Sequence, residues 1–404
     1  MTSELGRTKA AGQKTGCIKK TLSALFFIIC AVIVFGRPLL LYSDNGIIYF
    51  PGPKGRTALM LAGMSRSEND KVKKELNHVE IREGTTTIKD RLFFECSELE
   101  SASIPDSVTT MGKSVFWGCS SLKSVRLSAK TNKIPDETFV NCTSLTSIEI
   151  PEGVTEIGKG AFDSCSSLTS VKLPDSITFI DGEMALGCFC RCSRLSSVNI
   201  PANLHVIAPS MFGECVGLKT FVIPDHVTEI EEDAFFFCTN LTSVKLSKNL
   251  TRIGGGAFFG CSSLKNITIP ENVVSIEGGA FTQCSSLEKI VLPDKVGSLG
   301  TECFKQCVNL KSAVLPSQLK TIESWTFEGC KKLQTIEISG QVASIKREAF
   351  KDCSGLTSAV IPDSAAVIEK DAFAGCTNLK TVSIPKQTQV HPSAFPKHTQ
   401  ITRR

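Results

Sequence analysis

The sequence has few of the side chains that usually carry catalysis or anchor tight protein interfaces. Its 404 residues include five histidines, two tryptophans and two tyrosines. The histidines share no position in the repeat described below and show no metal-ligand spacing; they are His78, His205, His226, His391 and His398. No segment outside that repeat is long enough to hold a catalytic domain. The sequence therefore predicts a protein that is not an enzyme, with no cofactor and no metal ion.

The chain also lacks a strong excess of positive charge outside its first segment. The formal net charge is +5, and residues 1–75 contribute +7 of it, from 12 Lys or Arg against 5 acidic residues, which leaves −2 for the rest. Nucleic-acid-binding domains usually carry a clear basic excess. This distribution argues against nucleic acid as a partner.

What the sequence does contain is a repeat with a period of 23 residues. One cysteine recurs at this spacing, apart from a single gap of 27. These residues, here called the cysteine column, are Cys96, Cys119, Cys142, Cys165, Cys192, Cys215, Cys238, Cys261, Cys284, Cys307, Cys330, Cys353 and Cys376. A fixed period in this range is typical of solenoids, in which each repeat contacts only its neighbours.

Each repeat predicts one short strand. Leucine follows the cysteine by three residues, and apolar residues follow by six and eight, as in Val171 and Leu173. Their alternation places the apolar side chains on one face of a strand. A proline such as Pro174 usually follows, which removes a backbone donor and ends the strand.

The rest of each repeat predicts further buried positions. The pair exemplified by Ile177 and Ile180 forms a second buried edge. The segment Gly-x-x-Ala-Phe-x-x-Cys is expected to return the chain through a turn, or through one loop of helix, and to bury Ala161, Phe162 and Cys165. A single coil cannot shield so many apolar side chains, whereas stacked coils cover one another.

The pattern GxxAFxxCxxLxxVxLPxxVxxI resembles the BspA-type leucine-rich repeat, found in surface proteins of bacteria and of protist parasites. The resemblance covers residues 76–398. It implies an α/β solenoid: a right-handed horseshoe of about 13 coils with a parallel sheet on the concave face and short turns or helical loops elsewhere. It also implies non-enzymatic adhesion or recognition. The pattern departs from the family's at residues 186–191, taken as the insertion region, at Thr131, and at Phe395, where the last coil slips by one residue.

The N-terminus differs from the repeats. Residues 1–20 are basic and expected to be cytosolic, and the apolar run from Leu22 to Gly36 lies within a predicted membrane segment at 21–42. An uncleaved type II anchor, a cleaved signal peptide and a buried core helix are the alternatives, of which the anchor fits best. Residues 43–75 form an expected stem, with a short helix at 67–76 as a candidate cap, and 399–404 are a basic tail.

The cysteine column is expected to consist of free buried thiols. Equivalent positions in stacked coils lie about 4.8 Å apart with parallel side chains, which is unsuited to an unstrained disulfide. The cluster Cys188, Cys190 and Cys192 has no histidine or second cysteine pair nearby to complete a zinc site. We interpret it as a loop insertion, with one local disulfide and a metal site as the alternatives.

The residues four, five and seven positions after each column cysteine point outward from the predicted strand, and we call them the strand face. This face is rich in Ser, Thr and Lys and has no Tyr or Trp, the usual anchors of tight interfaces. It is either a solvated surface without a partner or a ligand surface for acidic glycans or an acidic protein patch. The candidate ligand residues, here called the basic face, are Lys219, Lys245, Lys265, Lys289 and Lys311.

Four Asn-x-Ser/Thr sequons occur. Asn240, Asn249 and Asn266 are candidate glycosylation sites, and Asn141, beside a column cysteine, is expected to be less accessible.

These observations predict a non-enzymatic leucine-rich repeat protein that mediates adhesion or ligand recognition through its sheet. Its expected location is the cell membrane, as a single-pass type II protein with extracellular repeats, or outside the cell after secretion. Its expected partner is a protein or an acidic glycan. The alternatives are a self-associating surface-coat scaffold and an intracellular protein-interaction scaffold.

Overall fold

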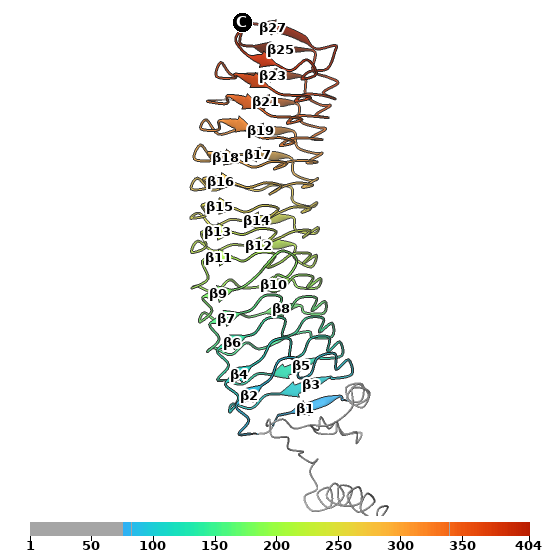
Figure 1. Cartoon of the computed structure of the whole chain (residues 1–404), viewed down its shortest axis with the longest axis vertical. Coiled ribbons are helices and arrows are strands. Elements are labelled where there is room, and N and C mark those ends of the chain that lie inside the picture. The colour runs from blue at the N-terminus through green and yellow to red at the C-terminus, as the bar shows by residue number, and fades with distance from the viewer. Residues whose placement is uncertain (1–75, 82, 339) are drawn as a thin grey trace, which may run out of the picture.

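The computed structural model describes residues 76–81, 83–338 and 340–404. These residues wind into an elongated column of stacked coils, with the C-terminus at one end (Figure 1). Each coil contributes up to two short strands, so the strands of successive coils form two columns of parallel pairs. One coil contains 23 residues, which is the period of the cysteine column. The predicted parallel-sheet solenoid is therefore confirmed.

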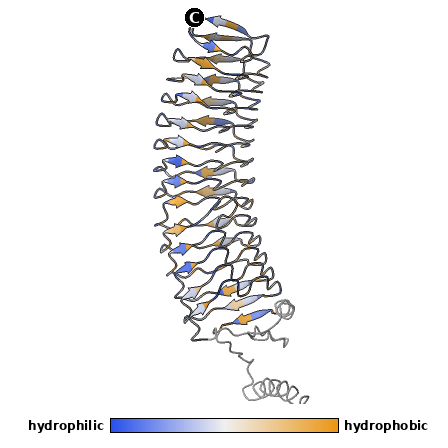
Figure 2. Cartoon of the chain, viewed as in Figure 1, coloured by the Kyte–Doolittle hydropathy of each residue, from blue (hydrophilic) through white to orange (hydrophobic). Residues whose placement is uncertain are grey.

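The first strand column follows the cysteines, as predicted. In β12 and β14 the outward Ser, Thr, Val and Lys side chains are exposed while the central residue is buried, and the strands carry hydrophobic and hydrophilic residues side by side (Figure 2). The column comprises β1 (His78–Glu80), β3 (Ser101–Ser103), β5 (Ser124–Arg126), β8 (Ser170–Val171), β10 (Ser197–Val198), β12 (Thr220–Val222), β14 (Ser243–Lys245), β17 (Lys289–Val291), β19 (Ser312–Val314), β21 (Thr335–Glu337), β23 (Ser358–Val360), β25 (Thr381–Ile384) and β27 (Gln400–Arg403).

The second strand column was predicted only as a buried edge. The residue at the position of Ile180 is buried and its predecessor faces outward, which makes a two-residue strand in each coil. The column comprises β2 (Thr87–Ile88), β4 (Thr110–Met111), β6 (Lys133–Ile134), β7 (Glu156–Ile157), β9 (Phe179–Ile180), β11 (Val206–Ile207), β13 (Glu229–Ile230), β15 (Arg252–Ile253), β16 (Ser275–Ile276), β18 (Ser298–Leu299), β20 (Thr321–Ile322), β22 (Ser344–Ile345), β24 (Val367–Ile368) and β26 (Gln389–Val390). The coil that holds β1 and β2 precedes Cys96, so the column has one coil more than the thirteen cysteines.

Of the two predicted return paths, the turn is confirmed and the helical loop is not. The described residues contain consecutive turns and no helix, so the α/β description of the solenoid is not confirmed either. In a typical coil, Asp233 and Phe237 adopt left-handed φ values of 56° and 50°. Their N–H groups and that of Phe235 donate to carbonyls of the next coil, at Gly255, Phe259 and Ala257. A helix needs an uninterrupted right-handed backbone and directs its N–H groups within the segment. Here alternate N–H groups join neighbouring coils instead.

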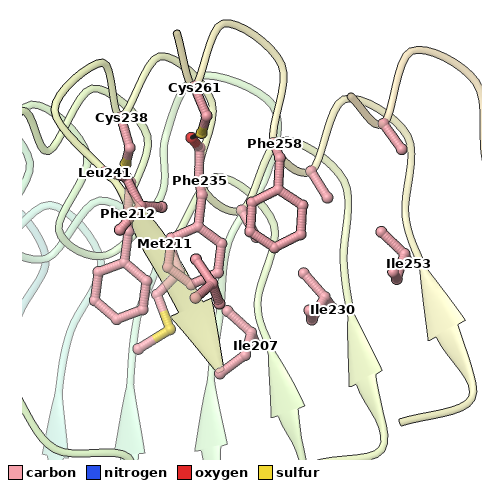
Figure 3. Packing of buried hydrophobic residues seen from close by; sticks show 14 of the residues in the cluster. Ile207, Met211, Phe212, Ile230, Phe235, Cys238, Leu241, Ile253, Phe258 and Cys261 are labelled. Carbon is pink, nitrogen blue, oxygen red and sulfur yellow. Dashed lines mark hydrogen bonds between the residues drawn. The ribbon is translucent and has the colours of Figure 1, made fainter. Parts of the chain in front are cut away.

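The core is a continuous stack of phenylalanine rings. Rings of successive coils, from Phe93 to Phe395, lie 4.8–6.0 Å apart between centroids and within 25° of parallel. Figure 3 shows Phe212, Phe235 and Phe258 in this stack, with Ile207, Ile230 and Ile253 of the second strand column below them. Phe395 closes the stack 4.8 Å from Phe373, so the one-residue slip of the last coil keeps the ring in register.

The C-terminal end of the column is a strand. Residues 399–404, expected as a basic tail, include β27, which pairs in parallel with β25. The guanidinium of Arg404 donates to the Ile361 carbonyl at 2.6 Å and to Asp363 at 2.8 Å. The Arg404 side chain therefore links β27 to the coil of Cys353, two coils earlier.

Candidate ligand-binding face

The cysteine column is a ladder of hydrogen bonds in the core. From Cys119 to Cys376, each column thiol donates to the carbonyl of the column phenylalanine in the preceding coil, at 3.0–3.2 Å from sulfur to oxygen. All described column cysteines are free and buried. The prediction of free thiols is confirmed, but they are more than apolar fillers. Burial raises the pKa of thiols such as Cys261, so they remain neutral and unreactive at pH 7.

The GCFCRC segment belongs to the repeat, and the insertion precedes it. The additional residues form a small loop at 183–186, closed by a bridge between Glu183 and Leu186. Cys188 occupies the position that Ala161, Ala234 and Ala257 have in other coils, and Cys192 is the regular column thiol. Cys188, Cys190 and Cys192 are free and buried. Among the described residues, no group of three or more His, Cys, Asp or Glu is arranged to hold a metal ion.

A buried ion pair supports the coil beside this loop. The Asp163 side chain is 2% exposed and receives two hydrogen bonds from the guanidinium of Arg191. Burial raises the pKa of Asp163, and the hydrogen bonds from Arg191 oppose this effect. Arg191 also donates to the Ala185 carbonyl at 3.4 Å, so the pair connects the insertion to the core.

The structure brings the five lysines of the basic face together on the first strand column. All five side chains are exposed. Lys289 begins β17 and Lys245 ends β14. Lys219 and Lys311 directly precede β12 and β19, and Lys265 has the same position in a coil where the bridge of Asn266 replaces the strand. The coil spacing of about 4.8 Å therefore places them along one side of five consecutive coils.

Most of these lysines lack a carboxylate partner. Lys311 pairs with Glu288 at 2.7 Å, and this hydrogen bond lowers the pKa of Glu288. Within the described part of the chain, Lys219, Lys245, Lys265 and Lys289 make no ion pair. Four cationic groups are thus free to attract an anionic ligand.

Exposed valines on the same face are a feature that sequence reasoning missed. They lie seven positions after the column cysteine, where other coils have polar side chains: Val222, Val291, Val314 and Val360 are 43–61% exposed. Val291 and Val314 are paired neighbours in β17 and β19. Inspecting this outward position for apolar residues would have found them.

A shallow pocket of about 340 Å³ lies within the basic face. It is lined by Asn266, Thr268, Glu271, Lys289 and Val291, among others. It forms where the coil of Cys261 has only the single bridge of Asn266 to Ser243 in place of a strand. Asn266 and Lys289 therefore share one pocket, and a glycan on Asn266 would lie against the basic face.

The other two candidate glycosylation sites lie away from this pocket. Asn240 and Asn249 are exposed in turns, and their side-chain amides donate to the carbonyls of Val216 at 2.9 Å and Asp225 at 2.8 Å. Asn141 is partly buried with φ of 59°. The relative accessibilities agree with the prediction.

The parallel strand pairs, the 23-residue coils and the leucine and phenylalanine core define the class: a leucine-rich repeat solenoid. The chain belongs to the BspA type leucine-rich repeat family. The family model, which spans six copies of the repeat, matches residues 71–188, 182–311 and 274–402.

Three solved structures that resemble this chain come from bacteria. A leucine-rich repeat protein from Bacteroides ovatus ATCC 8483 is 23% identical, over 92% of this chain and 99% of its own, with a TM-score of 0.74. A leucine rich cell surface protein from Faecalibacterium prausnitzii A2-165 is 26% identical, over 85% of this chain and 94% of its own, with a TM-score of 0.52. A leucine-rich repeat protein from Eubacterium ventriosum ATCC 27560 is 21% identical, over 90% of this chain and 95% of its own, with a TM-score of 0.52. No curated protein matches this chain.

The predicted membrane segment lies outside the described residues. Within 76–81, 83–338 and 340–404, no helix is long and apolar enough to cross a membrane.

Proposed function

We propose that this chain is a non-enzymatic surface protein that recognises an acidic glycan or an acidic protein patch through its basic face. The observation that carries the proposal is the set of four exposed lysines without carboxylate partners, Lys219, Lys245, Lys265 and Lys289, on consecutive coils. Like charges so placed repel one another modestly, so they do not stabilise the fold. Unpaired charges of one sign attract an oppositely charged ligand over a long range.

The adjacent valines complement these charges. Val291 and Val314 form an exposed apolar strip beside Lys289, and Val222 ends β12, three residues after Lys219. A ligand that combines anionic groups with apolar surface would contact both kinds of side chain. The solvated strand face without a partner is the alternative that an experiment must exclude.

The test compares two charge-matched variants. In the first, Lys219, Lys245, Lys265 and Lys289 are changed to Ser, which other coils carry at the same positions. In the second, four exposed lysines outside the strand face are changed to Ser: Lys130, Lys320, Lys331 and Lys370. The probe is immobilised heparin, together with an uncharged polysaccharide as a blank.

We expect heparin binding to weaken steeply with salt and to fall at least tenfold in the first variant alone. Thermal unfolding should change little in either variant, because all eight side chains are exposed. Equal losses in both variants, or binding that salt does not affect, would show that the basic face is only solvated surface. A mass that increases with protein concentration would instead favour the self-associating scaffold.

The proposed location is the cell surface. The F. prausnitzii relative is named a cell surface protein, and the basic stretch before the apolar run at 22–36 is typical of a signal anchor with a cytosolic N-terminus. Protease added to intact cells should then remove the repeats, or the culture medium should contain them if the segment is cleaved. Repeats that stay cell-associated and survive protease until the membrane is broken would contradict this location.

A further inference from the structure

A second groove, on the turn side of the coils, has a different chemistry from the basic face. It has a volume of about 490 Å³ and crosses the four coils of Cys238, Cys261, Cys284 and Cys307. Its walls are the residues directly before and after these cysteines, and none of them is charged. Phe237, Gln283 and Gln306 are the largest of these residues.

The backbone directs these side chains along the column. Phe237, Gly260, Gln283 and Gln306 have left-handed φ values of 50–70°. A Cβ on Gly260 would lie 2.6 Å from the ring of Phe237, so the ring rests directly on the glycine backbone of the next coil. Glycine at this position therefore gives the groove an aromatic floor at one end.

Two further rings extend that floor. Phe236 lies 4.5 Å from Phe237 and 5.4 Å from Phe259, between ring centroids. All three rings are partly exposed. Three phenylalanines that remain partly open to water form an aromatic surface next to the groove.

The middle of the groove offers hydrogen-bonding groups. The carboxamides of Gln283 and Gln306 make no hydrogen bond to any described residue. The hydroxyls of Ser262 and Ser285 donate to carbonyls of the preceding coil at 3.4 and 3.3 Å, and their oxygens remain able to accept. Each coil therefore presents uncharged donors or acceptors.

We propose that this groove binds a neutral oligosaccharide chain. Aromatic rings pack against the C–H face of a sugar, while amide and hydroxyl groups bond to its hydroxyls. The absence of charge in the walls disfavours an acidic glycan, whose ions would be desolvated without a counter-charge. An extended peptide repeats its side-chain direction every two residues, about 6.6 Å, out of phase with coils about 4.8 Å apart. The length of one pyranose unit along a sugar chain is close to the spacing between neighbouring coils.

The experiment titrates the full chain with neutral hexasaccharides of glucose, mannose and N-acetylglucosamine, and with a heparin hexasaccharide for comparison. Phe237→Gln removes the one aromatic ring that lines the groove itself and introduces the residue type that Gln283 and Gln306 have at the same position. Gln283→Ser removes a carboxamide and has a precedent in Ser164. Phe179→Ser is the control, because Phe179 is 53% exposed outside the groove and Ser275 occupies its position in another coil.

We expect at least one neutral hexasaccharide to bind with an affinity that salt does not change. Phe237→Gln should weaken that binding at least tenfold and Gln283→Ser several-fold, whereas Phe179→Ser and the four-lysine variant should bind as the unmodified chain does. Circular dichroism verifies that the variants fold. Failure of every neutral hexasaccharide to bind, or undiminished binding by folded Phe237→Gln, would overturn the proposal. Neither result bears on the basic face.

Discussion

Alkaline pH should unfold the repeat array cooperatively, because so many thiols are held neutral in its core. Burial raises the pKa of thirteen cysteines, ten of them in the cysteine column: Cys142, Cys165, Cys188, Cys190, Cys192, Cys215, Cys238, Cys261, Cys284, Cys303, Cys307, Cys330 and Cys353. The pKa rises to about 11 for Cys190 and about 12 for Cys307. In the unfolded chain a thiol has a pKa of about 8.5.

The direction of the effect follows from these shifts. A group whose pKa is raised by folding stabilises the folded state below the unfolded pKa, and this contribution is lost as pH rises toward the folded pKa. Each such thiol removes about 1.4 kcal/mol from the free energy of unfolding per pH unit above pH 8.5. For thirteen thiols that is roughly 18 kcal/mol per unit, against a typical domain stability of about 5–15 kcal/mol.

The assay follows far-ultraviolet circular dichroism and thiolate absorbance together between pH 7 and pH 11. We expect both signals to change in one transition between about pH 9 and pH 10, and the secondary structure to return when the pH is lowered under reducing conditions. Replacing three column cysteines by serine should make the pH dependence shallower by about three protons. A native signal retained at pH 11, or thiolates formed while the chain is still folded, would refute the argument.

Three further predictions concern single coils. Cys261→Ala should lower the free energy of unfolding, measured by chemical denaturation, by about 1–2 kcal/mol, because it leaves a small cavity and removes the hydrogen bond to the Phe235 carbonyl. The mobility of the unmodified chain on gels should not depend on reductant. Disulfides between column cysteines, found by peptide mapping, would contradict the prediction that these thiols are free. Gly187→Ala should prevent native packing of its coil, because the added Cβ would lie 1.8 Å from the Ser210 carbonyl oxygen. A melting temperature within about a degree of that of the unmodified chain would show that this close contact is absent. Arg191→Ser should lower the free energy of unfolding by about 2–3 kcal/mol at neutral pH, because it leaves the Asp163 carboxylate buried without its partner. The loss should be smaller at acidic pH, where that carboxylate is protonated. Adding Asp163→Val, the residue type of Val140 at the same position in its coil, should recover most of the lost stability, and no recovery would mean that the broken ion pair is not the cause.

The candidate site was only partly visible in the sequence. Counting positions from each cysteine placed Lys245 and Lys289 on an outward face, because alternation along a strand follows from the chain itself. The groove beside Phe237 was not predictable in this way. It depends on left-handed backbone at Gln283 and Gln306, and a left-handed φ at a residue other than glycine leaves no clear signature in a single sequence.

The repeat period determined the stacked coils, the first strand column and the buried phenylalanines, because a coil with this many apolar residues is stable only against copies of itself. The tertiary structure decided how the turn segment runs. Gly-x-x-Ala-Phe-x-x-Cys is compatible with a helical loop when its own residues alone are considered. Once a neighbouring coil lies about 4.8 Å away, alternate N–H groups such as that of Phe235 bond across to it, and the thiol of Cys261 does the same. These hydrogen-bond partners exist only in the assembled column. The turn conformation, the hydrogen bonds from the column thiols and the groove beside Phe237 therefore depend on the stacking of the coils.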